Sequence, residues 1–365
     1  MKIGSLFPVF VKKYFKGLVT ALVTKIDDKK GEPEYFYKAL FKKKYEPTLK
    51  FESLIGRGSI SAADVVAVDS PLPLKKRDSI SKSEGDIPKM GMKLSLRESE
   101  MNNIDTMIAL DSGGTSTKEV VKLLFGDVKK CIHGIHARLE ILALQALSTG
   151  TISITSENNT GTTNRLEFAI PSANRGGASV KWETSATAKP LDDIEAIQTK
   201  ARKKGDKLKY ILMSPTSFNQ FKKTAQVLER YAAYLNLAGS NTIVPSLSKA
   251  NMFMLEDYGM QIVIVDSSVQ IEKNGKKTAI TPWEEGKVTL LNSMEVGDLA
   301  YGTCAEERRP VAGVVYEKAD DIMLLSKFST NEPLAEFTSV QSYALPVLND
   351  VESIYQLNTL KTTWA

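Results

Sequence analysis

The stretch Gly259–Thr303 reads GMQIVIVDSSVQIEKNGKKTAITPWEEGKVTLLNSMEVGDLAYGT and carries the clearest local structure of the chain. Its apolar run Ile262–Val265 predicts a buried strand, and Asn274-Gly275 is the dipeptide that most readily adopts the two positive φ angles of a type I′ turn. A second apolar run, Val288–Leu291, follows a Pro-Trp-Glu-Glu-Gly loop and leads into Leu299-Ala300-Tyr301-Gly302. The pattern predicts a buried strand, a hairpin and a second buried strand, so its meaning is structural rather than catalytic.

The strongest helical signal lies between Thr115 and Ser148. Apolar residues in this segment follow alternating steps of four and three, which places them on one stripe of a helix. The stripe consists of Val121, Phe125, Val128, Ile132, Ile135, Leu139, Leu142 and Ala146. At ~1.5 Å per residue the helix would be roughly 50 Å long, and Thr149-Gly150 supplies a stop. We expect the stripe to pack on a sheet.

A further α/β block is predicted around a helix over Leu191–Lys204. Its first turn is acidic, with Asp192, Asp193 and Glu195, and its last turn is basic, as the helix dipole favours. Capping therefore explains the acidic cluster better than a metal site or an acid/base pair. The neighbouring predictions are strands over Ile152–Thr155, Arg165–Ile170, Ser179–Thr184 and Leu208–Met213, and a helix from Thr216 to about Leu235.

The order of segments in Gly259–Thr303 resembles the late part of the major capsid protein of phage lambda and its relatives, a family with the HK97-type capsid fold. Other stretches resemble the same family and occur in its order along the chain, from roughly residue 60 to residue 360. They are Pro88-Lys89 with Lys93–Arg97, Asp192–Ala196, Ile211–Lys223, Ala335–Thr338, Gln341-Ser342 and Pro346–Leu348. The first fifty residues match no segment of this family.

The resemblance implies an α+β, HK97-type fold with defined parts. These are an N-terminal arm over residues 1–60, an extended β-loop over 61–93, a peripheral domain over 94–190 with a spine helix over 115–148, an axial domain over 191–300, and a return to the peripheral domain over 301–365.

The extended loop is expected to need a neighbour. The run Lys75–Asp86 contains Ile80 as its one apolar residue, so it has too little apolar surface to form a core. We expect a two-stranded projection whose tip lies across an adjacent subunit. The basic residues Lys75, Lys76, Arg77 and Lys82 would meet acidic side chains there.

Positive charge is concentrated at the front of the chain. Residues 1–60 hold thirteen Lys/Arg against six Asp/Glu, a local +7, whereas the whole chain of 365 residues has a net charge of +5, so the remainder sums to −2. Such an arm would suit packaged DNA or an acidic partner, with Lys42, Lys43 and Lys44 as candidates to face DNA, or it is a solvated lysine-rich surface. The aromatic residues among these lysines could stack on single-stranded nucleic acid, contact a neighbouring subunit or enter the chain's own core.

One segment offers a rival function. Asp111–Thr117, reading DSGGTST after Ile108-Ala109-Leu110, resembles the first phosphate loop of sugar kinases and actin-like ATPases. In those enzymes the loop follows a strand near the N-terminus and opens a hairpin, whereas here it lies a hundred residues in and precedes a predicted helix. It also lacks the closing G-K-[ST] of a Walker loop. A glycine-rich turn with Thr115 or Ser116 as helix N-cap explains it more simply.

The sequence offers few residues for a metal site, a hydrolase or specific nucleic-acid binding. Cys131, His133 and His136 could hold a metal on one helix, but a structural zinc site usually draws four Cys or His ligands at close spacing, so we expect ordinary, partly buried side chains. A serine hydrolase motif and a helix-turn-helix, zinc-finger or RRM signature are missing from the sequence. No apolar run approaches the ~20 residues of a membrane span.

The sequence therefore predicts a structural major capsid protein without enzyme activity, cofactor or metal. The resemblance implies self-assembly as hexamers and pentamers into an icosahedral head that encloses double-stranded DNA, bound non-specifically. It also implies scaffold and portal proteins as partners, with a decoration protein as a further candidate. We expect a protein made in the host cytoplasm and located in the virion.

Overall fold

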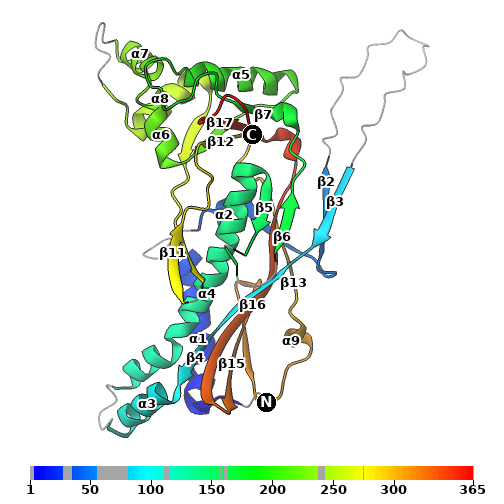
Figure 1. The fold of residues 1–365 in the computed structure, drawn as a ribbon. Helices are drawn as coiled ribbons and strands as arrows, with labels where there is room; N and C mark the ends of the chain where they lie inside the picture. The colour runs from blue at the N-terminus through cyan, green and yellow to red at the C-terminus, as the bar shows by residue number, and fades with distance from the viewer. Residues whose placement is uncertain are drawn as a thin grey trace, which may run out of the picture.

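The computed structural model describes residues 4–27, 35–55, 81–110, 116–156, 158–159, 163–236, 243–273 and 275–364. The molecule is elongated, with one sheet at each end and the long helix α4 (Ser116–Thr149) running between them (Figure 1). The other helices are α1 (Pro8–Asp27), α2 (Tyr37–Leu40), α3 (Glu98–Leu110), α5 (Pro190–Lys203), α6 (Pro215–Phe221), α7 (Ala225–Tyr234), α8 (Leu247–Tyr258) and α9 (Ala305–Arg308).

The larger sheet has six strands in the order β1-β13-β16-β15-β14, with β4 also paired to β16. The strands are β1 (Phe41–Tyr45), β4 (Lys89–Arg97), β13 (Gly297–Gly302), β14 (Val315–Ala319), β15 (Met323–Asn331) and β16 (Leu334–Leu348). The long strand β16 pairs with β15 along one edge and with β4 and then β13 along the other. Only β1 and β13 are parallel within this sheet.

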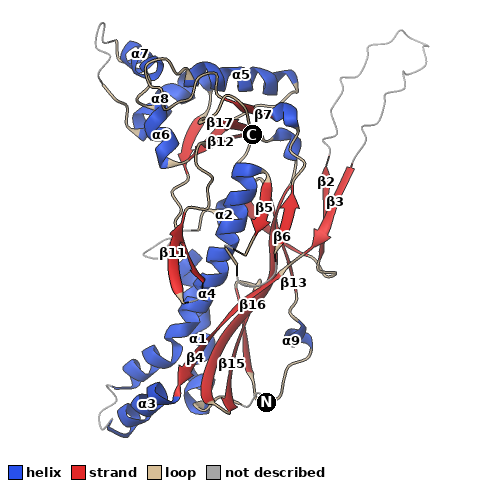
Figure 2. Ribbon diagram, in the orientation of Figure 1, coloured by secondary structure: helices blue, strands red, loops and turns tan. Residues whose placement is uncertain are grey.

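The smaller sheet has five strands in the order β7-β17-β12-β8-β9 and lies next to α5, α6, α7 and α8 (Figure 2). The strands are β7 (Arg175–Gly177), β8 (Tyr210–Met213), β9 (Gln261–Ile264), β12 (Lys287–Leu291) and β17 (Tyr355–Asn358). Around it lies a second hydrophobic core that includes Trp182, Phe221 and Phe253. Three two-stranded sheets complete the fold, namely β2 (Lys50–Ile55) with β3 (Ser81–Asp86), β5 (Thr151–Ile154) with β6 (Asn164–Glu167), and β10 (Val269–Lys273) with β11 (Lys276–Ile280).

The carboxyl end of α4 joins the two sheets. The carbonyl oxygen of Leu147 accepts hydrogen bonds from Thr289 Oγ1 at 3.0 Å and from Gln356 Nε2 at 2.9 Å, and both donors come from the smaller sheet. The last carbonyls of a helix have no partner within it, so these buried side chains satisfy a group that would otherwise be costly to bury. Gly150, at φ 74°, then turns the chain out of the helix.

The prediction for α4 is confirmed to within one residue at each end. Seven of the eight stripe residues are buried, and Val121 is half-buried. The stripe packs against β16, β4 and β15, as a helix with an apolar face requires.

The predicted hairpin is confirmed as β10–β11, with Gly275 at φ 74°. Its place differs from the expectation that it would join the axial-domain block. The hairpin forms a separate two-stranded sheet that contacts α4, while β9 and β12 on either side of it enter the smaller sheet. The outer strand β11 is exposed and so has no apolar face. The sequence of the hairpin therefore could not predict which part of the chain it would contact.

Other local predictions need correction. The helix expected from Thr216 to Leu235 is two helices, α6 and α7, because Thr224 Oγ1 donates to Phe221 O at 2.8 Å and ends the first helix. Residues 179–184 form turns rather than a strand. The helix α1 lies within the expected arm and packs on the body, burying Val11, Phe15 and Val19, which are spaced four apart.

The division into five parts stays a prediction, and the sheets cross its boundaries. Strand β7 from the expected peripheral domain and β17 from the expected return both lie in the smaller sheet, whereas β13 from the expected axial domain lies in the larger one. The chain therefore passes between the two sheets more often than the sequence indicated.

Truncating the stripe of α4 should destabilise the subunit. Ile132→Ala or Leu139→Ala removes a fully buried side chain and leaves a cavity, so we expect each to lower the free energy of unfolding by about 2–5 kcal/mol. Gly126→Ala is the control in the same helix, because an added Cβ has nothing within 4 Å; it should raise stability by about 0.5–1 kcal/mol. Urea unfolding of unassembled subunits measures both, and a wild-type midpoint for Ile132→Ala would contradict the expected packing.

Candidate functional site

A projecting pair of strands leaves the body beside the larger sheet. β2 and β3 are antiparallel, with Lys50 opposite Asp86 and Ile55 opposite Ser81, and their paired ends point away from the rest of the molecule (Figure 1). Buried Phe51 and Ile87 anchor the base of the pair. A Cβ at Gly85 would lie 2.7 Å from the Phe51 ring, so this close approach needs glycine. The projection thus begins near Lys50, earlier than residue 61, where the expected loop began.

One of the four predicted interface residues lies in the described part of this projection. Lys82 lies in β3 opposite Leu54, whereas Lys75, Lys76 and Arg77 lie outside the described residues. Their expected contacts with a neighbouring subunit stay a prediction.

The N-terminal segment is anchored by a buried carboxylate at the opposite end of the larger sheet. Glu336 in β16 accepts hydrogen bonds from Ser5 Oγ at 2.5 Å and from Leu6 N at 2.9 Å, just before α1. Burial raises the pKa of Glu336, and the bonds from Ser5 and Leu6 oppose that shift. The buried Lys327, whose pKa burial lowers, lies 3.9 Å from Glu336 Oε1 and donates to Leu124 O.

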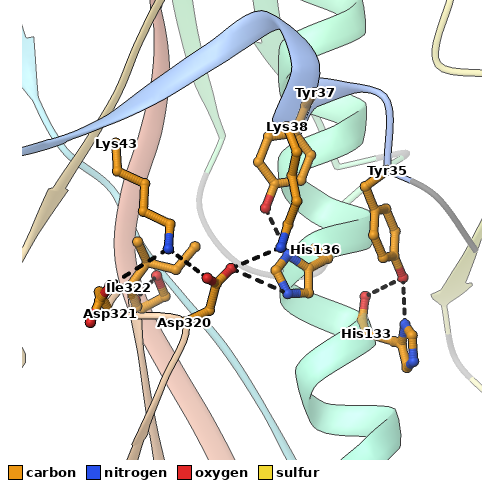
Figure 3. Close-up of polar contacts among 10 residues, drawn as sticks. Tyr35, Tyr37, Lys38, Lys43, His133, His136, Asp320, Asp321 and Ile322 are labelled. Carbon is orange, nitrogen blue, oxygen red and sulfur yellow. Dashed lines mark hydrogen bonds and ion pairs between the residues drawn. The ribbon is translucent and has the colours of Figure 1, made fainter. Parts of the chain in front are cut away.

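A second anchor holds the chain between residues 35 and 43, and we call it the arm–spine cluster (Figure 3). It consists of Tyr35, Tyr37, Lys38, Lys43, His133, His136, Glu140 and Asp320. Tyr37 OH lies 2.7 Å from His136 Nδ1, and Tyr35 OH lies 2.8 Å from His133 Nδ1. The two tyrosines therefore reach two histidines one turn apart on α4.

Glu140 holds the backbone of the same segment with its side chain. Its carboxylate accepts hydrogen bonds from Phe36 N at 3.1 Å and Tyr37 N at 2.8 Å, at the start of α2. Burial raises the pKa of Glu140, and the bonds from Tyr37, Ser267 and Phe36 oppose that shift. His133, His136 and Glu140 lie at spacings of three and four, so one face of α4 receives the arm.

Asp320 brings a third element into the cluster. Its carboxylate lies 3.1 Å from Lys38 Nζ and 2.5 Å from Lys43 Nζ, and only 4% of its side chain is exposed. His136 Nε2 lies 3.7 Å away, which permits charge attraction but is too long for a hydrogen bond. Asp320 and Asp321 turn between β14 and β15 with φ angles of 50° and 59°, which non-glycine residues seldom adopt. The ion pairs of Asp320 offset the strain of that turn.

The three arm lysines, Lys42, Lys43 and Lys44, all lie in β1, and each has an acidic partner. Lys42 Nζ lies 2.6 Å from Glu295, Lys43 binds Asp320, and Lys44 Nζ lies 3.0 Å from Glu46. Lys42 and its partner are largely exposed, whereas Lys43 reaches a buried carboxylate. Lys43 therefore contributes to the fold of its own subunit, and contact of any of the three lysines with DNA stays a prediction.

Two residues singled out in the sequence, Cys131 and Asp193, acquire structural roles. Cys131 donates to Thr338 O in β16, on a different side of α4 from the tyrosines that engage the histidines, and burial raises the pKa of its thiol to about 12. Among the described residues no group of three or more Cys, His, Asp or Glu lies in a metal-binding arrangement. Asp193 accepts hydrogen bonds from Ser179 N and Trp182 Nε1, so it fixes the preceding loop rather than capping α5.

The kinase alternative needed a strand before its phosphate loop. Ile108-Ala109-Leu110 instead forms the end of helix α3, and α4 begins at Ser116, while residues 111–115 lie outside the described residues. A helix on each side does not give the strand and hairpin of that loop.

The overall fold agrees with the comparisons with known proteins. A family model described as phage major capsid protein E matches residues 19–359. The chain belongs to this family. Its function is that of a structural protein of the phage head, and the comparisons give no support to a kinase.

Two solved structures show the same fold as this major capsid protein. A putative capsid protein of a prophage of E. coli CFT073 is 17% identical with a TM-score of 0.56, and the match covers 94% of this chain and 98% of that one. A phage-related protein from Bordetella bronchiseptica RB50 is 12% identical with a TM-score of 0.52, covering 96% and 98%. No curated protein matches the sequence. The expected HK97-type fold is confirmed.

Sequence reasoning missed the acidic members of both anchors. Glu140, Asp320 and Glu336 are isolated in sequence from the arm that they bind, and only the Asp320-Asp321 pair, placed between two apolar runs, gave a visible turn signal. Among the helices of the described residues, none is both long enough and apolar enough to cross a membrane.

Neutralising Asp320 should loosen the arm of this capsid protein. Asp320→Asn keeps a residue that tolerates positive φ but removes the charge that holds Lys38 and Lys43, so we expect a loss of about 1.5–3 kcal/mol in unfolding free energy. Asp321→Asn is the matched control, since its side chain is 72% exposed, and it should change stability by less than about 0.5 kcal/mol. Hydrogen exchange of residues 35–45 reports the loosening; equal exchange in both variants would count against the cluster as an anchor.

Proposed function

We propose that this capsid protein self-assembles as hexamers and pentamers into an icosahedral head that encloses double-stranded phage DNA. The observation that carries the proposal is the β2–β3 pair, which extends away from the body. Among the described residues, few contacts join this pair to the rest of its own subunit. A strand pair of that kind gains its stabilising contacts from a neighbour. Closed assemblies reuse such a surface in each copy.

We infer that the protein catalyses no reaction and acts in the virion after synthesis in the host cytoplasm. Membership of a family of major capsid proteins supports a role based on interfaces between subunits. This role implies scaffold and portal proteins as further partners, with a decoration protein as an additional candidate.

The tip of the extended loop is proposed to bind acidic side chains of a neighbouring subunit through Lys75, Lys76, Arg77 and Lys82. Single exposed ion pairs contribute only about 0–1 kcal/mol, so assembly would depend on several of them and weaken in salt.

Reversing these four charges to Glu should leave folded subunits that form few or no shells, because attraction becomes repulsion at every contact. Negative-stain electron microscopy counts the shells, and circular dichroism checks the fold. The control changes Lys75, Lys76 and Lys82 to Arg, which preserves charge and should assemble normally. Normal shells from the Glu variant would refute the proposed contacts.

We further propose that exposed lysines of β1 contact packaged DNA. In the subunit these lysines bind carboxylates, so DNA would compete with the pairs of Lys42 and Lys44. Contacts to phosphates release counterions, which makes binding fall with salt in proportion to their number.

The double change Lys42→Gln with Lys44→Gln should reduce the salt slope of DNA binding by about 1–2, since roughly one counterion is released per neutralised phosphate. It should not alter the fold, unlike Lys43→Gln. Filter binding of duplex DNA to unassembled subunits over a salt series gives the slope. An unchanged slope would assign these lysines to protein contacts or solvent.

A further inference from the structure

A groove of about 590 Å³ runs along the middle of α4, outside both anchors. Its floor is α4 from Lys130 to Leu142, one wall is β4 from Lys89 to Leu94, and the other wall is β10. Its volume falls within the range of ~300–1,000 Å³ that is usual for ligand sites. Gly134 allows β4 to pack closely on α4, because a Cβ at this position would collide with Met92 Sδ.

Both walls present strand edges. Within the described residues, β4 pairs only with β16 and β10 pairs only with β11, so each has one edge without a strand partner. An unpaired edge offers a row of backbone N–H and C=O groups to which an extended segment can add. The side chains Met90, Met92 and Leu94 of β4 are half-buried along the groove, which gives the added segment apolar contacts.

Arg138 is the unusual member of the groove. Its Nη2 donates to Asn158 O at 2.9 Å, but its Nη1 is buried and has no hydrogen-bond partner among the described residues. Burial lowers the pKa of this guanidinium, and no described carboxylate offsets that cost. A buried cation that lacks a counter-charge is destabilising unless a partner supplies one.

The charged side chains of the groove are mostly basic. Four basic residues and one acidic residue line the groove, namely Lys89, Lys130, Arg138, Lys277 and Glu272. Asp127 Oδ1 lies 2.9 Å from Lys130 Nζ and offsets its charge. Three basic residues against Glu272 still leave the groove cationic.

We propose that this groove binds an extended acidic segment of a partner protein, which adds as a strand at the edge of β4 and places a carboxylate on Arg138. The partner alternates acidic with apolar side chains, since the groove has a cationic member and an apolar wall. A carboxylate suits the planar guanidinium, which can bind both of its oxygens. This inference concerns a surface of the single subunit and extends beyond shell formation.

Two other occupants fit less well. The extended loop of a second copy carries four basic residues within Lys75–Lys82, which the cationic groove would repel. Nucleic acid would satisfy the charge but leave the apolar wall unfilled.

The test uses full-length, unassembled subunits and a fluorescent peptide of about seven residues that alternates glutamate with valine. We expect saturable binding by anisotropy, and little binding of the matched peptide of lysine and valine. Arg138→Met should weaken binding about tenfold or more, as loss of a charge-assisted bidentate pair implies. Because it removes a half-buried charge that no described carboxylate offsets, it should also raise the thermal midpoint of the free subunit by at least about 1 °C.

Two variants keep the result interpretable. Lys277→Glu changes an exposed residue of β11 and should weaken the glutamate peptide without affecting the fold. Arg165→Met removes an exposed, ion-paired arginine of β6 and should leave binding unchanged.

Several outcomes would overturn the proposal. They are absence of binding to wild type, equal binding of the lysine peptide, and a lower thermal midpoint for Arg138→Met, which would make Arg138 a structural residue. Displacement of the peptide by duplex DNA would assign the groove to nucleic acid. Conversion of wild-type oligomers to monomers by the peptide, with Arg138→Met already monomeric, would assign it to a second copy.

Discussion

The burial of α4 is the constraint on which the rest of this capsid subunit depends. Its stripe packs on the larger sheet, and its last turn meets the smaller one through Leu147. A helix of 34 residues cannot bury such a stripe against its own chain neighbours, so it needs strands from distant parts of the sequence. The arm, the hairpin and β4 all take their positions from its surface.

Polar groups on α4 then decide which segments attach where. His136 and Glu140 would be expensive to bury alone, and Tyr37, the start of α2 and Asp320 supply their partners. Glu336 acts likewise for the segment before α1. Such buried polar contacts make the docking of the arm specific, because an apolar contact alone would tolerate a shifted register. Arg138 on the same helix donates to Asn158 O through Nη2, but its Nη1 has no hydrogen-bond partner within the described residues.

Membership of a major capsid protein family gives this protein a structural role in the phage head. A strand pair that extends from the body and an arm held by buried ion pairs are features of a subunit that completes its contacts with other copies. The sheets and α4 enclose the two hydrophobic cores of the subunit.

The sequence by itself determined the elements whose signals are local. The 3.6-residue period gave α4, Asn274-Gly275 gave the hairpin, and collinear short motifs gave the family and its HK97-type fold. The period of four from Phe7 to Val19 could also have given α1, but the lysines between these residues obscured it. Only the tertiary structure decided the parallel pairing of β1 with β13, the place of the hairpin beside α4, and the bonds of Lys43 to Asp320 and Ser5 to Glu336. These contacts join residues more than 250 positions apart or, for the hairpin, depend on a partner surface. No local pattern encodes them, because the energy of each depends on burial that exists only after the chain has folded.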